Sequence, residues 1–191
     1  MSKDRKQIIL QSLAKMLEER DATKVTTASL AKESGITEAA LYRHFPSKRS
    51  IFLELFTFCD QTIFQKVSEI KKQETIAPDE KIRLIFFFFI IFLEKNKGFA
   101  RILSREALGP NEKNVIDAVN QFYGRLELSM KQILSTKKDL IQLTPGISAH
   151  LITSNIEGVI SRFIRNGFKE MPSGYLDNYW ALLSGSIFKI N

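Results

Sequence analysis

Residues 26–52 constrain the fold more than any other stretch, because they encode two short helices joined by a tight turn. The segment reads TTASLAKESGITEAALYRHFPSKRSIF. Thr26 and Thr37 are good N-cap residues for the two helices, and Gly35 takes the positive φ of a tight turn at little cost. Pro46 ends the second helix, because the residue before a proline is pushed out of the α region. This pattern is typical of a helix-turn-helix, whose second helix enters the major groove of DNA.

The second helix has an apolar face and a face suited to DNA. Leu41 and Phe45 are four residues apart, so we expect both to pack inward against Leu30. A recognition helix needs small residues where it approaches base pairs and longer polar residues that hold phosphates beside them. The residues that meet this need, and that we predict to contact DNA, are Glu38, Ala39, Ala40, Tyr42, Arg43 and His44. The alternative for Tyr42 is that it only covers the small core.

A third helix begins directly after Pro46. Ser47 is placed to cap it, and its first turn carries Lys48 and Arg49. Backbone amides at a helix N-terminus and nearby cations together favour a phosphate. We therefore predict that Lys48 contacts the DNA backbone, and a solvated lysine is the alternative.

The run ITEAALYRHFPSK, from Ile36 to Lys48, resembles the signature of TetR-family regulators. This resemblance implies an all-α fold, in which an N-terminal three-helix DNA-binding domain precedes a larger helical domain that dimerises and usually receives a signal. We predict a helix-turn-helix domain at residues 1–50 and a helical dimerisation and partner-binding domain at residues 51–191. The chain of 191 residues is long enough to bury a substantial core in this arrangement.

Charge and cysteine content agree with a cytoplasmic DNA-binding protein. The net charge is +7, and residues 1–50 contain ten Lys and Arg against six Asp and Glu. A basic surplus alone is also typical of a merely soluble protein, so it supports DNA binding only together with the motif. Cys59 is the one cysteine, which excludes an intramolecular disulfide and a cysteine-rich zinc site and suits a reducing cytoplasm.

Neither a signal peptide nor a membrane span is expected. Residues 1–7 are charged, and the apolar positions that follow are interrupted by polar residues. The strongest apolar run, residues 84–93, has about half of the roughly twenty residues that a bilayer span requires. We read it as a buried helix and place the protein in the cytoplasm.

The remaining helices follow from apolar periodicity. We expect a long helix from Ile51 to about Lys72, a loop over residues 73–79 that contains Pro78, and a phenylalanine-rich helix from Glu80 that ends before Gly98. Further helices are expected at residues 99–108, 112–136, 147–168 and 175–190, with a break at residues 109–111. The phenylalanines could line a pocket, but aromatic stripes mostly fill cores.

The two terminal helices are the expected homodimer surface. Small residues on one face let a second helix approach closely, and these are Ala149, Ser154, Gly158 and Ser161. The alternative is that this face packs within its own subunit. His44 lies in the predicted recognition helix and His150 in the expected dimer helix, and the chain has neither a glycine-rich phosphate loop nor acids at metal-ligand spacing. We therefore expect no enzyme activity, no cofactor and no metal.

Segments outside the helix-turn-helix resemble one branch of the TetR family, whose members act in nucleoid occlusion. They are ILQSLA at 9–14, EKN at 94–96, RIL at 101–103, SRFIR at 161–165, and Phe168, Lys169, Pro172, Asp177 and Trp180. The resemblance implies a homodimer that binds palindromic sites across the chromosome, as one or two dimers per site, and is therefore associated with the nucleoid. While bound, it blocks assembly of the tubulin-like division protein FtsZ. The competing reading is a ligand-responsive repressor.

This closer resemblance also assigns residues. It places Thr26 in the DNA contact region, and we add Thr27 and Thr37 to the predicted contacts. It places on the FtsZ-binding surface Phe58, Lys66, Phe88, Ile91, Lys95 and Asn96. This chain departs from the branch at four of these positions, where the branch has arginine for Lys66 and Lys95, leucine for Phe88 and glycine for Ile91.

Overall fold

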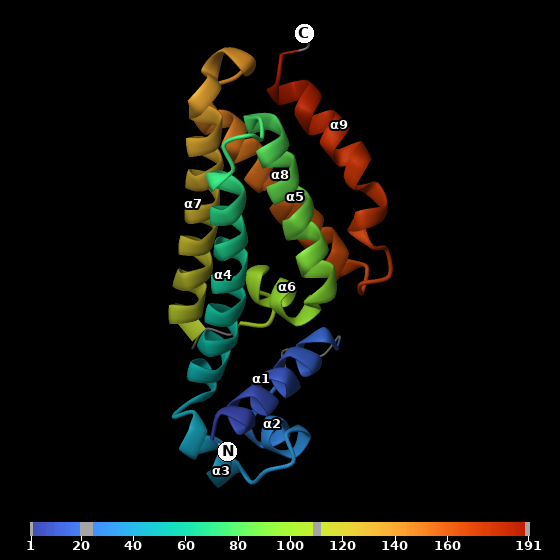
Figure 1. The fold of residues 1–191 in the computed structure, drawn as a ribbon. Helices are drawn as coiled ribbons and strands as arrows, with labels where there is room; N and C mark the ends of the chain where they lie inside the picture. Colours follow the sequence, from blue (N-terminus) through green and yellow to red (C-terminus); the bar gives the residue numbers. More distant parts are fainter. Residues whose placement is uncertain (1, 20–24, 109–111, 190–191) are drawn as a thin grey trace. The chain divides into compact units, whose positions relative to one another are not determined.

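The computed structural model describes residues 2–19, 25–108 and 112–189, and within these ranges it is helical (Figure 1). The extended backbone of these ranges pairs only at one isolated bridge, between Ile141 and Phe188. The elements in chain order are α1 (Ser2–Glu18), α2 (Thr27–Glu33), α3 (Glu38–His44), α4 (Lys48–Lys72), α5 (Pro78–Lys95), α6 (Lys97–Leu103), α7 (Lys113–Leu134), η3 (Ser135–Leu140), α8 (Pro145–Arg165), η4 (Pro172–Tyr175) and α9 (Leu176–Ile187). The predicted all-α fold class is confirmed.

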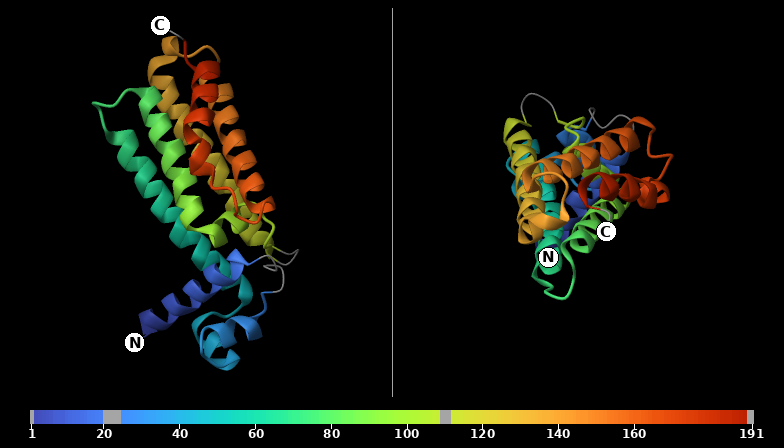
Figure 2. Two further views of the ribbon diagram at one scale, coloured as in Figure 1. Left: turned by 90° about the vertical axis from the view of Figure 1, so that its right-hand side faces the viewer. Right: turned by 90° about the horizontal axis from the view of Figure 1, so that it is seen from above.

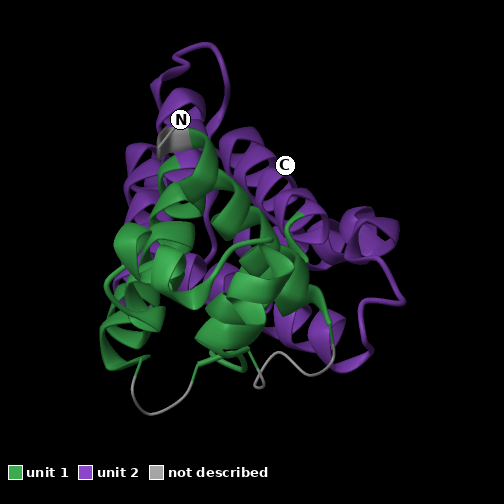
Figure 3. Ribbon diagram, turned by 90° about the horizontal axis from the view of Figure 1, so that it is seen from below, with its two compact units in different colours: residues 1–61, 96–119 green, residues 62–95, 120–191 purple. Residues whose placement is uncertain are grey.

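The chain forms two compact units (Figure 3). The first unit contains Met1–Gln61 and Asn96–Val119, and the second contains Thr62–Lys95 and Asn120–Asn191. Helix α6 and the start of α7 therefore group with the N-terminal helices, while α4 continues without a break from one unit into the other. The functional domain boundary that we place after residue 50 stays a prediction.

In the first unit, α1 is the scaffold on which the other helices rest. Its apolar residues Ile9, Leu13 and Leu17 recur at spacing four and are buried, as their periodicity predicts. Helix α1 packs against α2 and, more extensively, against α6. The ring of Phe99 in α6 lies 5.8 Å from that of Phe56 in α4, which adds an aromatic contact to this core.

Several expectations about helix ends were wrong. The helix expected at residues 99–108 is α6, which ends at Leu103, and the helix expected from residue 147 is α8, which begins at Pro145. Pro78 does not lie in the preceding loop but opens α5, because the first helical turn lacks amide partners anyway and suits the fixed φ of proline. Gly98 does not follow the end of α5 as a terminating glycine. Helix α5 ends at Lys95, and Gly98 lies inside α6 with its backbone against that of Ala14 in α1.

The second unit is built around α5. Helix α5 contacts both α8 and α9, and the two views in Figure 2 show these helices side by side. Phe86 and Phe89 are fully buried, with their rings 6.4 Å from Trp180 and 5.8 Å from Phe122 respectively. The second half of α4 adds Phe64, which packs edge-on against Phe122 at 5.3 Å. Phe86 and Phe89 thus fill the core, as aromatic stripes usually do.

The terminal helices differ from the prediction in one residue of the expected dimer face. Ala149 is fully buried within its own chain, so it does not contribute to an outer surface. Ser154 and Gly158 are exposed and Ser161 is half-buried. The expected break at residues 109–111 lies outside the described residues. None of the helices in the described ranges is both long and apolar enough to cross a membrane.

Candidate nucleic-acid interface

The caps and the turn of the helix-turn-helix form as the sequence predicts. Thr26 caps α2, since its hydroxyl accepts a hydrogen bond from the Ser29 amide at 3.1 Å and the Ser29 hydroxyl accepts one from the Thr26 amide at 2.9 Å. Gly35 has a φ of +64° in the turn. Thr37 caps α3 by accepting from the Ala40 amide at 3.2 Å. Both helix starts are therefore fixed by their own side chains.

Helix α3 ends where the sequence predicts and turns its apolar residues inward. Phe45 caps its C-terminus with extended backbone directly before Pro46. Leu30, Leu41 and Phe45 are all buried, so α2 and α3 share one small core. Burial of this face leaves the opposite face of α3 accessible to a partner.

The accessible face of α3 consists of the residues predicted to contact DNA. Glu38, Ala39 and Arg43 are exposed, and Ala40 and His44 are half-buried. The side chain of Tyr42 is 48% exposed, so it does more than cover the core. Two small residues between long polar ones give the profile of a helix that fits into a groove.

A hydrogen-bonded chain joins the first residue of α2 to two side chains of α3. The Tyr42 hydroxyl donates to Thr27 Oγ1 at 3.4 Å, and the Thr27 hydroxyl donates to Glu38 Oε1 at 2.5 Å. The three side chains are partners across two helices, so the position of each depends on the others. The structure thus brings together predicted contacts that are separated by up to 15 residues in the sequence.

At the start of α4, Ser47 forms the predicted cap. Its hydroxyl accepts from the Ser50 amide at 3.1 Å, and the Ser50 hydroxyl accepts from the Ser47 amide at 3.2 Å. The Lys48 ammonium lies 3.7 Å from Glu112 Oε1 and 5.3 Å from the centroid of the Phe52 ring. Sequence reasoning missed Glu112, because no local pattern relates it to a lysine so distant along the chain.

A second cation near the recognition helix was also missed. The Lys6 ammonium in α1 lies 5.1 Å from the centroid of the Phe45 ring, which fixes a positive charge beside the C-terminus of α3. The sequence places Lys6 among several N-terminal basic residues and has no feature that singles it out.

Five of the six predicted FtsZ-binding residues lie on α4 and α5, and the sixth, Asn96, lies directly before α6. In the first unit, Phe58 is 65% exposed, and Asn96 is the N-cap residue of α6. In the second unit, the Lys66 ammonium lies 3.2 Å from Glu69 Oε2. Hydrogen bonds from Lys66 and from Gln65 lower the pKa of Glu69.

Helix α5 turns a mixed apolar and basic face outward. Ile91 is 37% exposed and Lys95 is exposed, while Phe88 is half-buried with its ring 5.8 Å from that of Phe92. Positions 88, 91 and 95 follow helical spacing, so they lie on one side of α5. The opposite side supplies buried Phe86, Phe89 and Ile90 to the core.

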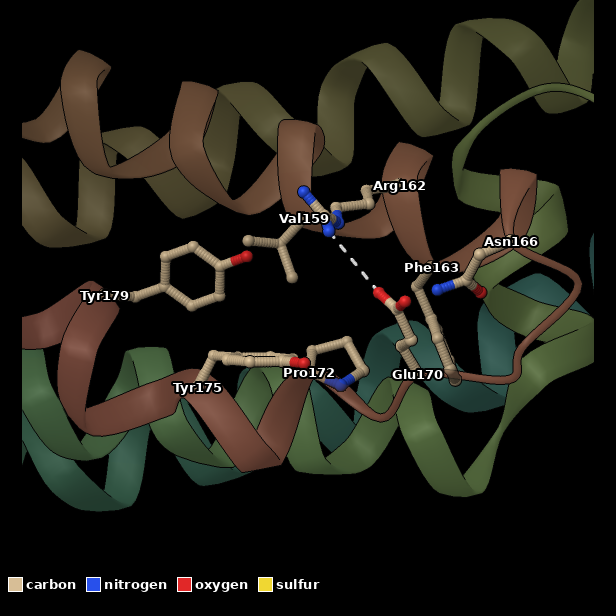
Figure 4. A pocket seen from close by; sticks show the side chains of 8 residues that line it. All are labelled: Val159, Arg162, Phe163, Asn166, Glu170, Pro172, Tyr175 and Tyr179. Atoms are coloured by element: carbon tan, nitrogen blue, oxygen red, sulfur yellow. Dashed lines mark hydrogen bonds and ion pairs between the residues drawn. The ribbon is translucent and has the colours of Figure 1, made fainter.

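A pocket in the second unit lies away from the phenylalanine-rich core (Figure 4). It lies between α8 and the segment that leads into α9, and it is an open hollow of about 210 Å³, a volume that includes open solvent. Arg162 and Glu170, with 3.4 Å between Nη2 and Oε2, stand across one part of it, and Tyr175 and Tyr179 line another. Among the described residues, no group of three or more His, Cys, Asp or Glu side chains is arranged to hold a metal ion.

Comparison with known proteins gives matches to both parts of the chain. Residues 9–55 match the family described as bacterial regulatory proteins of the tetR family, and residues 75–187 match the SlmA-like tetracyclin repressor-like C-terminal domain. The nucleoid occlusion factor SlmA of Vibrio cholerae serotype O1 is 39% identical over 189 residues, which cover 96% of each protein. SlmA of Photobacterium profundum is 33% identical over the same share of both proteins.

Solved structures show the same fold at low identity. NalD, the secondary repressor of the MexAB-OprM multidrug efflux pump of Pseudomonas aeruginosa, aligns with a TM-score of 0.80 and 15% identity over 98% of both chains. The transcriptional regulator FadR of Bacillus subtilis, solved with stearoyl-CoA, aligns with a TM-score of 0.74 and 16% identity, covering 95% of this chain and 98% of that one.

The helix-turn-helix, the fold and these matches define a DNA-binding regulator of the TetR family, and not an enzyme. Regulators of this family act as dimers on DNA. Within the TetR family, the C-terminal match and the sequence identity across almost the whole chain show that the chain belongs to the SlmA family.

Proposed function

We propose that this protein is a nucleoid occlusion factor, which binds palindromic sites on the chromosome and, while bound, antagonises assembly of FtsZ. The observation that carries the proposal is the outer face of α5, where Ile91, Phe88 and Lys95 are turned away from the core on a helix whose other side is fully packed. Apolar side chains that lie together on one helix face beside a cation suit contact with a partner protein.

The DNA-binding half of the proposal rests on α3. Tyr42, Arg43 and the small residues Ala39 and Ala40 supply groove contacts, with Glu38 and Thr27 holding Tyr42 in place. Thr26, Thr37, His44 and Lys48 flank them and suit contacts to the phosphates. In a dimer, the two recognition helices lie in successive major grooves about one helical turn apart.

The dimer in this proposal forms through α8 and α9. Leu182 of α9 is 73% exposed, and Ile147 and Leu151 of α8 are exposed as well. Ser154 and Gly158 on the same helix lack bulk, so that a second copy can approach closely. Apolar residues beside small ones suit a self-complementary helix pair.

The FtsZ half of the proposal involves residues from two helices. Phe58 and Lys66 are exposed on α4, the same helix that begins with Lys48 at the DNA-facing end. A single continuous helix thus carries a predicted phosphate contact and two predicted partner contacts. Lys66 and Lys95 keep a positive charge where the branch has arginine. Lys66 pairs with Glu69 at the surface, and because such an exposed ion pair is weak, a partner's carboxylate can replace Glu69 at little cost in free energy.

The test is an FtsZ assembly assay with a DNA duplex selected by the protein from a random pool. We expect the wild-type protein with this duplex to reduce FtsZ polymer in a sedimentation assay. Lys95→Glu should abolish the effect and keep its DNA affinity, because it reverses an exposed charge on the outer face of α5. The matched control is Lys131→Glu, which makes the same change at an exposed position of α7.

The outcomes distinguish an FtsZ inhibitor that uses the assigned surface, an FtsZ inhibitor that uses another surface, and a DNA-binding protein that does not act on FtsZ. If Lys131→Glu retains the inhibition and Lys95→Glu loses it, the proposal stands. Inhibition that survives Lys95→Glu would contradict the assigned surface. An absence of inhibition by the wild-type protein, with tight binding to the duplex, would indicate a repressor or an architectural DNA protein instead.

A further inference from the structure

The first unit contains a carboxylate that engages a lysine at the DNA-facing end of α4. Glu112 directly precedes α7, its side chain is 9% exposed, and its Oε1 lies 3.7 Å from the Lys48 ammonium. The Lys48 side chain retains 31% exposure. The pair is therefore asymmetric, with a buried acid fixed in the protein and a longer, partly solvated base that is able to move.

The geometry directs Lys48 along α4 rather than beyond its first turn. Its ammonium lies 5.3 Å from the centroid of the Phe52 ring, one turn further into the helix. The ring face and the carboxylate both attract the cation, so they hold it in the same place. A lysine at the first position of α4 that reaches a phosphate in front of the helix must leave both partners.

We propose that Glu112 is an internal counter-anion that lowers DNA affinity by occupying Lys48 until a DNA phosphate displaces it. The inference rests on the proposed function, in which Lys48 contacts the DNA backbone. Exchange of one anion for another at the same ammonium changes no bond and needs no co-reactant. The free energy of the Lys48–Glu112 pair is then subtracted from the free energy of DNA binding.

The exchange also lets a residue outside the helix-turn-helix, Glu112, influence the affinity for DNA. Glu112 belongs to the same compact unit as the helix-turn-helix, although the sequence places it after α6. Displacement of its lysine removes one favourable contact from a carboxylate that is only 9% exposed, and this loss costs free energy. DNA binding is therefore opposed by a residue outside the helix-turn-helix, which sets the affinity without reading any base.

Four variants and a control test the inference through DNA affinity measured over a range of salt concentrations. The variants are Lys48→Ala, Glu112→Gln, the double variant and Glu112→Asp, each titrated with the selected duplex by fluorescence anisotropy. Glu106→Gln is the control, because it removes one acid from the same unit that pairs with Arg101 at 3.5 Å and not with Lys48. Circular dichroism establishes that each variant is folded.

We expect Glu112→Gln to bind DNA about three to ten times more tightly, which is the range of a partly buried ion pair worth roughly one kcal/mol. Lys48→Ala should bind more weakly and reduce the slope of log affinity against log salt by about one counterion. In the Lys48→Ala background, Glu112→Gln should have no further effect. Glu112→Asp, which draws the carboxylate back from the lysine, should give an intermediate gain and serves if Glu112→Gln does not fold.

Three results overturn the inference in different ways. A gain from Glu112→Gln that persists without Lys48, or that Glu106→Gln reproduces, would mean a general charge effect. Unchanged affinity in Glu112→Gln, with a loss in Lys48→Ala, would mean that the pair does not oppose DNA binding although Lys48 contacts phosphate. Unchanged affinity and slope in Lys48→Ala would remove the premise and with it the phosphate contact in the proposed function.

Discussion

Gly98 lies so close to the backbone of Ala14 that a β-carbon on it would overlap the Ala14 carbonyl oxygen. This close approach joins α6 to α1, the helix that supports the helix-turn-helix. Only glycine allows two helices to meet backbone to backbone in this way. The contact explains why α6, which lies far from α1 in the sequence, belongs to the same compact unit.

Gly98→Ala should destabilise the protein by about 1–3 kcal/mol, the usual range for overpacking, although a better helix propensity offsets part of the loss. The measurement is the free energy of unfolding in urea. Gly124→Ala in α7 is the control, because a β-carbon there meets no atom within 4 Å. It should be neutral or stabilising by up to about 1 kcal/mol. Equal effects of the two changes would contradict the close contact.

Tyr42 offers a test of the recognition helix that is separable from folding. Tyr42→Ala should weaken DNA binding by about 1–3 kcal/mol, the range of a good base contact, because the side chain is 48% exposed on the face of α3. Tyr42→Phe keeps the ring and loses only the hydroxyl that donates to Thr27, so it should lose less. Both are measured by DNA titration. A large fall in the melting temperature of Tyr42→Ala would instead mean that the residue serves the core.

The proposed dimer surface predicts the effect of a charge in the middle of α9. Leu182→Glu should convert the dimer to a monomer in sedimentation at micromolar concentration, because a carboxylate at a buried apolar contact is costly to desolvate. The same variant should bind a palindromic duplex much more weakly. Leu182→Met, which keeps the apolar volume, should remain dimeric. A Leu182→Glu variant that still sediments as a dimer would place the interface elsewhere.

Cys59 predicts a pH effect with a definite sign. Burial, assisted by the charge of Asp60, raises the pKa of the Cys59 thiol from 9.0 to about 12. The unfolded thiol therefore ionises first, so this group's contribution to stability is complete below pH 9 and is lost as the pH rises from 9 towards 12. We expect the free energy of unfolding to fall less steeply above pH 9 in Cys59→Ala than in the wild-type protein.

Thiol labelling provides an independent check on Cys59. A buried, protonated thiol should react with iodoacetamide at about pH 8 only as fast as the protein unfolds. Rapid labelling of the native protein would show that the thiol is accessible, and the pH prediction would then lose its basis.

The sequence predicts those features that depend on neighbouring residues. The caps at Thr26, Thr37 and Ser47 and the turn at Gly35 formed as expected, because each requires only groups within three or four residues. Apolar spacing likewise predicted that Ile9, Leu13 and Leu17 face a core. Features that depend only on nearby residues can therefore be predicted from the sequence.

Contacts between distant segments were not predictable in the same way. The identity of Gly98 is equally consistent with a helix end and with a close helix contact, and only the position of α1 decides between them. Glu112 looks like an ordinary acid at a helix start, and its pairing with Lys48 depends on how α7 meets α4. Ala149 illustrates the same limit, since small residues suit an interior contact as well as a subunit interface.

A chromosome-wide map of where this protein binds in its own cells tests the central claim most directly. The account predicts many dispersed palindromic sites that become sparse towards the replication terminus, because a nucleoid occlusion factor must block FtsZ wherever unsegregated DNA remains. One or two sites at promoters would contradict it and indicate a local repressor, whose ligand would then be the next question.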